Sequence, residues 1–176
     1  QRIRERIEQR RPVPYILGEA WFCGLSIEVD ETVLIPRSPI AELIEAGFSP
    51  WVDPQTVTRV ADVGTGSGCI AIACALAFPE ARIDALDIAP GALAHAAHNA
   101  RRHGVGAQVA VQRSDLLASI PPEPLVDVIV SNPPYVDTRS MIELPAEYQH
   151  EPRRALEAGA DGMDIVRRLL PEAAVR

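Results

Sequence analysis

The sequence predicts a doubly wound α/β fold, in which parallel strands alternate with helices. From Thr58 onward, short apolar segments alternate with segments of helical pattern, the first strand runs directly into glycines, and the later strands are followed by polar residues. Strand and helix in alternation imply parallel strands joined by right-handed crossovers. The expected strands are 60–63, 82–86, 108–112 and 126–130, and the expected helices are 69–78 and 90–103.

The residues before this pattern predict a smaller N-terminal region. Residues 1–9 have the pattern of the end of a charged helix, which Pro12 and Pro14 terminate. Residues 15–29 form two extended runs around Gly24 and predict a β-hairpin. A short helix over 40–46 and a linker over 47–55 follow, so that the chain divides into a region 1–50 and a core 51–176.

Composition indicates a soluble globular domain without a membrane segment. Of the 176 residues, 47% are hydrophobic and 23% are charged, and no apolar run approaches the roughly 20 residues that span a bilayer. The formal charge of −7 disfavours strong direct binding to nucleic acid, which favours basic surfaces. The three cysteines form no C-x-x-C pair and no histidine has further ligands at metal spacing, so we expect the cytoplasm and no metal site. The chain has no initiator Met and stops at Arg176 within a helical pattern, which predicts a fragment whose core is truncated at its C-terminal end.

The first chemical signal is a glycine-rich loop between the first strand and the first helix of the core, Gly64-Thr65-Gly66-Ser67-Gly68. Its three glycines allow a sharp turn and let a ligand lie against the backbone. Asp87 follows nineteen residues later, at the end of the next strand, where a carboxylate can accept hydrogen bonds from both hydroxyls of a ribose. Together they predict an adenosine-type pocket at the carboxyl ends of the strands.

The glycine spacing separates two classes of nucleotide. A dinucleotide fingerprint, G-x-G-x-x-G, needs a glycine at position 69, where this chain has Cys69. The observed G-x-G-x-G resembles class I S-adenosylmethionine-dependent methyltransferases, in which the loop passes the amino-acid tail of the cofactor. NAD stays open as the alternative. Asp115 could accept a hydrogen bond from an adenine amine and Leu116 could pack on the ring, although an ordinary Asx turn explains the pair equally well.

The most specific motif, Asn132-Pro133-Pro134-Tyr135, follows the fourth strand. Consecutive prolines stiffen the segment and present carbonyl oxygens without competing donors. An amide or aryl NH2 can donate one hydrogen to the Asn132 side-chain oxygen and one to the Pro133 carbonyl. The poorly nucleophilic nitrogen is then held with its lone pair toward a methyl donor, so that rate comes from orientation and electrostatics, not from a strong base. Tyr135 is expected to pack against the planar group.

These motifs together resemble the HemK/PrmC group of protein N(5)-glutamine methyltransferases over nearly the whole chain. Further matching segments are Arg11-x-Pro-x-Tyr-Ile-Leu-Gly18, Leu34-Ile-Pro-Arg37, Glu151-Pro152, Ala155-Leu156 and Ala158-Gly159-Ala160-Asp161-Gly162. Trp21-Phe22-Cys23-Gly24, Pro36-Arg37-Ser38-Pro39-Ile40 and Tyr148-Gln149-His150-Glu151-Pro152 are more similar to the PrmB branch than to the release-factor branch. The PrmB branch methylates a glutamine of the third large-subunit ribosomal protein.

The resemblance implies a Rossmann-like class I methyltransferase fold that uses S-adenosyl-L-methionine. By position it implies cofactor contacts from Gly64 to Gly68 and from Asp87, Leu116 and Asn132, acceptor contacts along 132–135, and a substrate-side role for residues 1–50. A ribosomal protein is the expected partner, and a peptide chain release factor is the alternative. Members of the family carry a longer helical region before this chain and further strands after it.

Three other functions stay open from sequence alone. Asn-Pro-Pro-Tyr also occurs in enzymes that methylate exocyclic amines of nucleic-acid bases. A non-catalytic binding domain would keep the fold without turnover. A hydride-transfer enzyme using NAD would leave Asn-Pro-Pro-Tyr unexplained.

Overall fold

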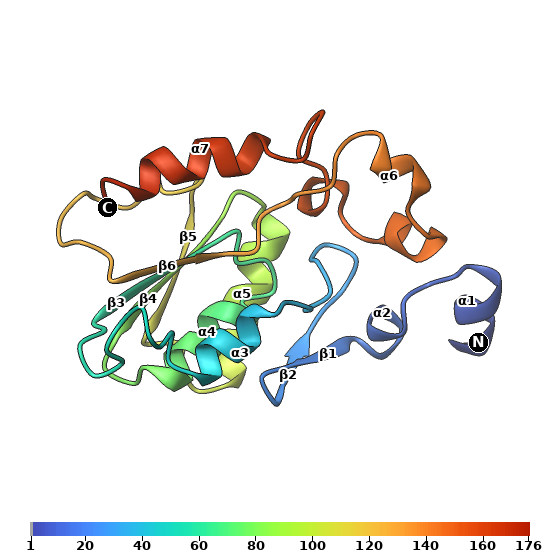
Figure 1. Ribbon diagram of the computed structural model, residues 1–176. Helices are drawn as coiled ribbons and strands as arrows, with labels where there is room; N and C mark the ends of the chain where they lie inside the picture. Colours follow the sequence, from blue (N-terminus) through green and yellow to red (C-terminus); the bar gives the residue numbers. More distant parts are fainter. Residues whose placement is uncertain (1) are drawn as a thin grey trace.

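A computed structural model describes residues 2–176 (Figure 1). Its main sheet has four parallel strands in the order β5-β4-β3-β6. The strands are β3 (Arg59–Val63), β4 (Arg82–Asp87), β5 (Val109–Arg113) and β6 (Val128–Ser131). Each predicted strand is therefore present, shifted by no more than two residues at either end, and the predicted doubly wound α/β fold is confirmed.

Strand β3 is one of the two inner strands of the sheet, and all five of its residues are buried. A strand covered on both faces reads as a continuous apolar run, which is what made residues 60–63 recognisable. From β3 the chain builds outward through β4 to β5 and then returns to the opposite side of β3 for β6. This reversal of strand order leaves a crevice at the carboxyl ends of β3 and β6, where ligands of such folds bind.

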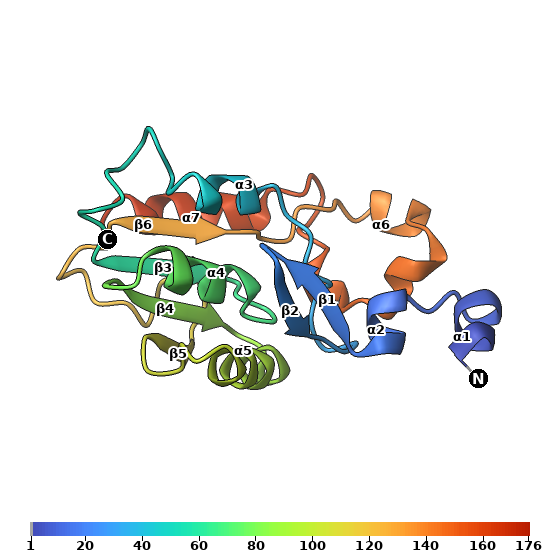
Figure 2. The same cartoon turned by 90° about the horizontal axis from the view of Figure 1, so that it is seen from below.

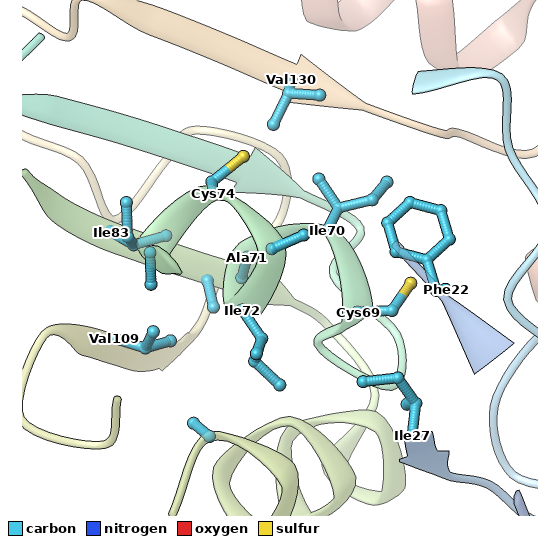
Figure 3. Close-up of a cluster of buried hydrophobic side chains, with 14 of the residues drawn as sticks. Phe22, Ile27, Cys69, Ile70, Ala71, Ile72, Cys74, Ile83, Val109 and Val130 are labelled. Carbon is cyan, nitrogen blue, oxygen red and sulfur yellow. The ribbon is translucent and has the colours of Figure 1, made fainter. Parts of the chain in front are cut away.

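Helices cover both faces of the sheet, as the two views in Figures 1 and 2 show. On one face lie α3 (Ile40–Glu45), α4 (Cys69–Ala77) and α5 (Pro90–Arg102), and α7 (Asp164–Ala173) lies on the other. Residues 69–75 of α4 are all buried, and Figure 3 shows its side chains among Ile83, Val109 and Val130 of the sheet. Leu169 of α7 packs in a second cluster with Val63 and Leu86. The result is a three-layer domain.

The N-terminal region departs from one expectation. Residues 15–17 do not begin an extended run but end a short helix, α2 (Val13–Leu17), and the hairpin is confined to β1 (Glu19–Phe22) and β2 (Leu25–Glu28). Pro12 is the N-cap residue of α2 and Pro14 lies in its first turn. Backbone N–H groups in the first turn have no partner within the helix, so a proline without an N–H is tolerated there. Helix α1 (Arg2–Glu8) ends before the prolines, close to Arg10 with its φ of +57°, and the prolines start the next helix.

The hairpin joins the core through apolar side chains. Phe22 and Ile27 are buried in the same cluster as Cys69 and Ile70 of α4, and Figure 3 shows them facing that helix. The remaining elements are the short helix α6 (Ser140–Glu143) and two 3₁₀ helices, Ala146–His150 and Arg153–Ala155. Among the residues described, no helix combines the length and apolarity that crossing a bilayer requires.

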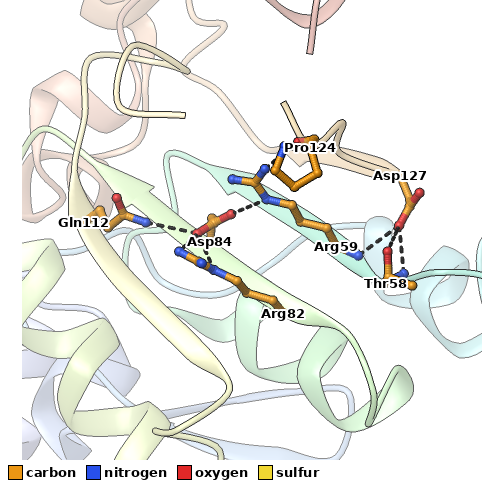
Figure 4. A network of polar contacts seen from close by, with 7 residues as sticks. All are labelled: Thr58, Arg59, Arg82, Asp84, Gln112, Pro124 and Asp127. Carbon is orange, nitrogen blue, oxygen red and sulfur yellow. Dashed lines mark hydrogen bonds and ion pairs between the residues drawn. The ribbon is translucent and has the colours of Figure 1, made fainter. Parts of the chain in front are cut away.

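A polar network stabilises the end of the sheet away from the glycine loop (Figure 4). The Arg59 guanidinium donates to Asp84 over 2.9 Å and to the Pro124 carbonyl over 2.6 Å, and both charged side chains are buried. Arg82 and Gln112 contact the second oxygen of Asp84. Asp84 is therefore fully paired, which is the condition under which a buried carboxylate is tolerated.

Candidate functional site

A cavity of about 330 Å³ lies at the carboxyl ends of β3, β4 and β6. This volume is in the range of sites for small molecules, roughly 300–1,000 Å³. Its wall includes residues 64–67 after β3, Asp87 at the end of β4, residues 114–116 after β5, and residues 131–134, which begin with the last residue of β6. The fold thus brings together, at one edge of the sheet, motifs that are far apart in the sequence.

The glycines of the loop have two different tasks. Gly64 and Gly66 have φ of +75° and +54°, and a Cβ added to either would meet no atom closer than 4.0 Å. Both residues line the cavity, so their missing side chains leave its floor open. Gly68 has φ of +82°, but a Cβ there would lie 2.9 Å from Ala96 Cα, and the residue does not line the cavity. Gly68 thus allows close packing of the start of α4 on α5, while Thr65 and Ser67 line the cavity.

Asp62, immediately before the loop, is a residue that sequence analysis assigned no role. One of its carboxylate oxygens accepts hydrogen bonds from the Thr65 hydroxyl over 2.6 Å and from the Ala71 amide over 3.1 Å. The other oxygen is buried without a partner among the residues described. Burial raises the pKa of Asp62 to about 7. The carboxyl group thereby ties the loop to the first turn of α4.

Asp87 lies beside the loop, as predicted, and already contacts it. One carboxylate oxygen accepts a hydrogen bond from the Gly66 amide over 3.0 Å, and the other accepts one from the Ala89 amide over 2.9 Å. Each carboxylate oxygen has two lone pairs, so both can accept a further hydroxyl. The geometry is compatible with a ribose seated between the loop and β4.

Residues 115 and 116 line the cavity at its β5 side. Leu116 has φ of +51°, an unfavourable region for a leucine, which turns the chain sharply there. The Asp115 carboxylate is half-exposed and pairs with Arg168 of α7 over 2.7 Å. Of the two predicted adenine contacts, Leu116 is free to pack on a ring, whereas Asp115 is engaged with an arginine.

The Asn-Pro-Pro-Tyr segment leaves β6 directly into the cavity. Residues 132–134 line the main cavity, and the Ser131 hydroxyl ties the strand end to β3 by donating to the Val63 carbonyl over 2.7 Å. Tyr135 does not line the main cavity and is 67% exposed. It lines instead a small neighbouring cavity of about 20 Å³ that shares Asn132 and Pro133 with the main one. Tyr135 is therefore placed at the outer side of the segment.

The segment after Asn-Pro-Pro-Tyr is held by the Ala-Gly-Ala-Asp-Gly motif. The amides of Tyr135 and Val136 both donate to the Leu156 carbonyl, over 3.1 and 2.8 Å. A Cβ on Gly162 would lie 2.3 Å from the Tyr135 carbonyl oxygen, so only glycine permits this approach. The motif thus supports the strip from behind.

A cover over the cavity is formed by residues 32–38, which line it. The Arg37 guanidinium pairs with buried Glu151 over 2.9 Å and lies over the Tyr148 ring at 5.0 Å. The buried Tyr15 hydroxyl donates to the Val33 carbonyl over 2.6 Å, and burial followed by the nearby Glu151 charge raises its pKa. In the sequence, the segments 11–18, 34–37 and 148–152 were noted only for their resemblance to the family. In the structure they contact one another and hold the cover in place.

The arrangement suits an adenosine-type ligand with a flexible polar tail. The same cavity is lined by the glycines that leave its floor open, by the Asp87 carboxylate and by the apolar side chain of Leu116. The Asn132 amide also lines it. Across residues 2–176, no group of three or more His, Cys, Asp or Glu side chains is placed to hold a metal ion.

Comparison with curated proteins gives close relatives. A protein of Bordetella pertussis described as a ribosomal protein uL3 glutamine methyltransferase is 49% identical over 172 residues, which are 97% of this chain and 57% of that protein. A protein of Francisella tularensis with the same description is 50% identical over 165 residues, 93% of this chain and 52% of that one. The chain spans about half the length of the curated relatives it matches.

Solved structures share the fold at low identity. The hMettl16 catalytic domain, in complex with the MAT2A 3'UTR hairpin 6, has a TM-score of 0.63 and 18% identity, covering 97% of this chain and 59% of that one. The N-terminal domain of human METTL16 in complex with SAH has a TM-score of 0.57 and 21% identity, covering 86% and 56%. At such identities the likeness concerns the fold alone.

The model of the methyltransferase small domain matches residues 50–169. This range contains the glycine loop, Asp87 and Asn-Pro-Pro-Tyr. The chain therefore belongs to the methyltransferase small domain family.

Proposed function

We propose that this chain catalyses S-adenosylmethionine-dependent methylation of a glutamine side-chain nitrogen in a protein, and that the acceptor is ribosomal protein uL3. The observation that carries the proposal is a single cavity lined by the glycine loop, Asp87 and the Asn-Pro-Pro strip. Relatives at 49–50% identity, described as uL3 glutamine methyltransferases, support the choice of acceptor. We further propose action in the cytoplasm.

The cofactor site is assigned to the wall around the glycine loop. Gly64 and Gly66 leave room for the amino-acid tail, the Asp87 oxygens accept the ribose hydroxyls, and Leu116 packs on the adenine. When bound, S-adenosylmethionine supplies an electrophilic methyl group on a sulfonium. The apolar residues 33–36 of the cover limit the access of water to the reacting groups.

The acceptor site is assigned to residues 132–135. Within the described residues the Asn132 side chain makes no hydrogen bond, so its oxygen can accept one hydrogen of the glutamine NH2, and the Pro133 carbonyl can accept the other. Two fixed acceptors orient the nitrogen lone pair toward the cofactor side of the cavity. Tyr135, exposed at the outer side, packs against the entering amide.

Residues 1–50 form the substrate-side region in this proposal. Arg6 and Arg10 of this region pair with Glu147 over 2.9 and 2.8 Å, and the His150 ring contacts the Gln9 carbonyl. These contacts join the N-terminal helices to the segment that follows Asn-Pro-Pro-Tyr. In this proposal a protein acceptor that approaches Tyr135 contacts both the N-terminal helices and the segment that follows Asn-Pro-Pro-Tyr.

Methyl transfer from labelled S-adenosylmethionine tests the proposal. Purified uL3, a peptide chain release factor and nucleic acid are offered in parallel to the wild-type protein, to Asn132→Ala and to Gln55→Ala. Gln55 is an exposed amide in the linker and serves as the matched control. We expect label on a glutamine of uL3, a loss of about 10²–10³-fold in kcat for Asn132→Ala and no change for Gln55→Ala.

The other acceptors give distinct outcomes. Label on the release factor alone retains the chemistry and rejects the acceptor. Label on nucleic acid alone rejects protein methylation. Binding of S-adenosylmethionine without transfer to any acceptor identifies a binding domain.

A further inference from the structure

Helix α5 touches the glycine loop at two consecutive turns of one face. Ala96 is the residue against which Gly68 packs, and Asn99 lies one turn further along the helix. Both side chains are fully buried. An asparagine at such a position needs partners for its oxygen and for both amide hydrogens.

Asn99 has all of these partners, and they belong to two different segments. Its side-chain oxygen accepts a hydrogen bond from the Glu28 amide over 2.9 Å. Its side-chain nitrogen donates to the Glu28 carbonyl over 3.0 Å and to the Ser67 carbonyl over 2.9 Å. The first two bonds pair Asn99 with the end of β2 as a neighbouring strand would. The third reaches the glycine loop.

Other polar side chains of α5 and of His103, the residue that caps it, contact the hairpin or Asp30 just after it, and none of them is bonded to the glycine loop. The His98 ring lies 3.1 Å from the Glu28 carboxylate, and the His103 ring lies 2.9 Å from the Ser26 carbonyl. Among the hydrogen bonds of residues 2–176, Asn99 alone joins the hairpin and the glycine loop through one side chain. The hairpin leads directly into residues 32–38, the cover of the cavity.

We propose that Asn99 is a positioning residue for the cofactor site, which sets the glycine loop and the hairpin relative to each other. The proposal rests on the proposed function insofar as the loop binds S-adenosylmethionine. Asn99 touches no part of the cavity and acts through Ser67, whose carbonyl it holds beneath the cavity floor. Ligand bound at the loop and the seating of the hairpin are then coupled, and by reciprocity each stabilises the other.

Asn99→Asp tests this directly because it keeps the shape of the side chain. The carboxylate can still accept from the Glu28 amide, but it loses both donors and faces the carbonyls of Glu28 and Ser67. If the loss of one such hydrogen bond displaces the loop, the affinity for the ligand should fall about tenfold. Asn99→Ala removes the bonds without adding a buried charge and is the second variant if the first does not fold.

Gln108 provides the matched control. Its side-chain nitrogen also donates to backbone carbonyls, those of Ala75, Phe78 and Ala81, over 2.8–3.0 Å, and these lie at the far end of α4. Gln108→Glu thus makes the same replacement of an amide by a carboxyl group, at a partly buried position that does not contact the glycine loop.

The measurements are the Kd of S-adenosylhomocysteine by calorimetry, the melting temperature, and hydrogen exchange of peptides spanning 19–29 and 62–70. We expect Asn99→Asp to raise the Kd at least about tenfold, with no change of Kd in Gln108→Glu. In the wild-type protein the ligand should slow exchange in both peptides. In Asn99→Asp it should no longer slow exchange in 19–29.

Equal effects of Asn99→Asp and Gln108→Glu on the Kd would overturn the proposal, because a merely structural role predicts that pattern. Protection of 19–29 that persists in Asn99→Asp also overturns it. If the wild-type protein binds no S-adenosylhomocysteine, the proposed function fails. Hydrogen exchange measured without ligand then tests the role of Asn99 separately. Faster exchange over 62–70 in Asn99→Asp but not in Gln108→Glu then supports the hold of Asn99 on the loop, and unchanged exchange refutes it.

Discussion

Replacing single glycines by alanine should separate stability from ligand binding within one loop. Gly68 and Gly66 both have positive φ, at +82° and +54°, so that alanine is strained at either position. They differ in what the new methyl group meets. At Gly68 it would lie 2.9 Å from Ala96 Cα and 3.1 Å from Ala96 Cβ, whereas at Gly66 it faces the cavity with no atom closer than 4.0 Å.

The magnitudes follow from these distances. The strain of the left-handed region costs about 1–2 kcal/mol for a non-glycine residue. At Gly68 the methyl group also crowds a helix backbone, which can yield only if α5 moves, and such overpacking adds about 1–3 kcal/mol. The sum, about 3 kcal/mol, lowers Tm by about 6–12 °C for a domain of this size. Strain alone, as for Gly66→Ala, lowers Tm by about 2–8 °C.

Gly104→Ala measures the strain by itself. Gly104 has φ of +75° with no atom within 4 Å of an added Cβ, and it lies after α5, outside the cavity lining. Thermal denaturation of the three variants, with calorimetric titration of S-adenosylhomocysteine, gives both readouts. We expect Gly68→Ala to be the least stable, and Gly66→Ala to match Gly104→Ala in Tm while losing at least about tenfold in affinity. A Gly68→Ala protein no less stable than Gly104→Ala would refute the reasoning.

Three further perturbations follow from the site. Burial raises the pKa of Asp62 from 3.8 to about 7. The contribution of Asp62 to the free energy of unfolding is therefore greatest below about pH 4, declines as the pH rises to about 7 and is constant above that pH. The total decline is on the order of 4 kcal/mol. Asp62→Asn should remove this slope from urea denaturation measured between pH 4 and 8, and an unchanged slope rejects the assignment. Glu151→Gln leaves Arg37 half-exposed without its buried partner and should cost about 2 kcal/mol in the same assay. Glu157→Gln, which breaks the exposed Arg153 pair, should produce no measurable change, and equal effects of the two would contradict the role of burial. Tyr135→Ala should raise the KM for the protein acceptor about tenfold and leave the Kd for S-adenosylhomocysteine unchanged, because Tyr135 lies outside the main cavity; a changed Kd would place it on the cofactor instead.

The fold class, and most of the segments that line the cavity, could be predicted from the sequence alone. The glycine loop, Asp87 and Asn-Pro-Pro are each contiguous and sit at strand ends, and the strand–helix alternation brings the carboxyl ends of parallel strands to one edge. Backbone freedom at glycine and its loss at proline are properties of single residues. Such local signals can therefore be recognised without knowing what surrounds them. The wrong expectation at residues 15–17 is also local, since Pro12 and Pro14 both fit the start of a helix as well as its end.

The residues that support the site could be recognised only in the folded molecule. Glu151 and Arg37 are separated by more than a hundred positions and become partners because the cover folds onto the segment after Asn-Pro-Pro-Tyr. Gly68 resembles its neighbouring glycines until α5 is seen to pack against it, and Asn99 lies in a helix pattern that gives no sign of its bonds to Glu28 and Ser67. The physical reason is that the need for a polar partner, or for a missing methyl group, depends on burial. Burial is decided by elements that are distant in the chain and meet only in the folded molecule.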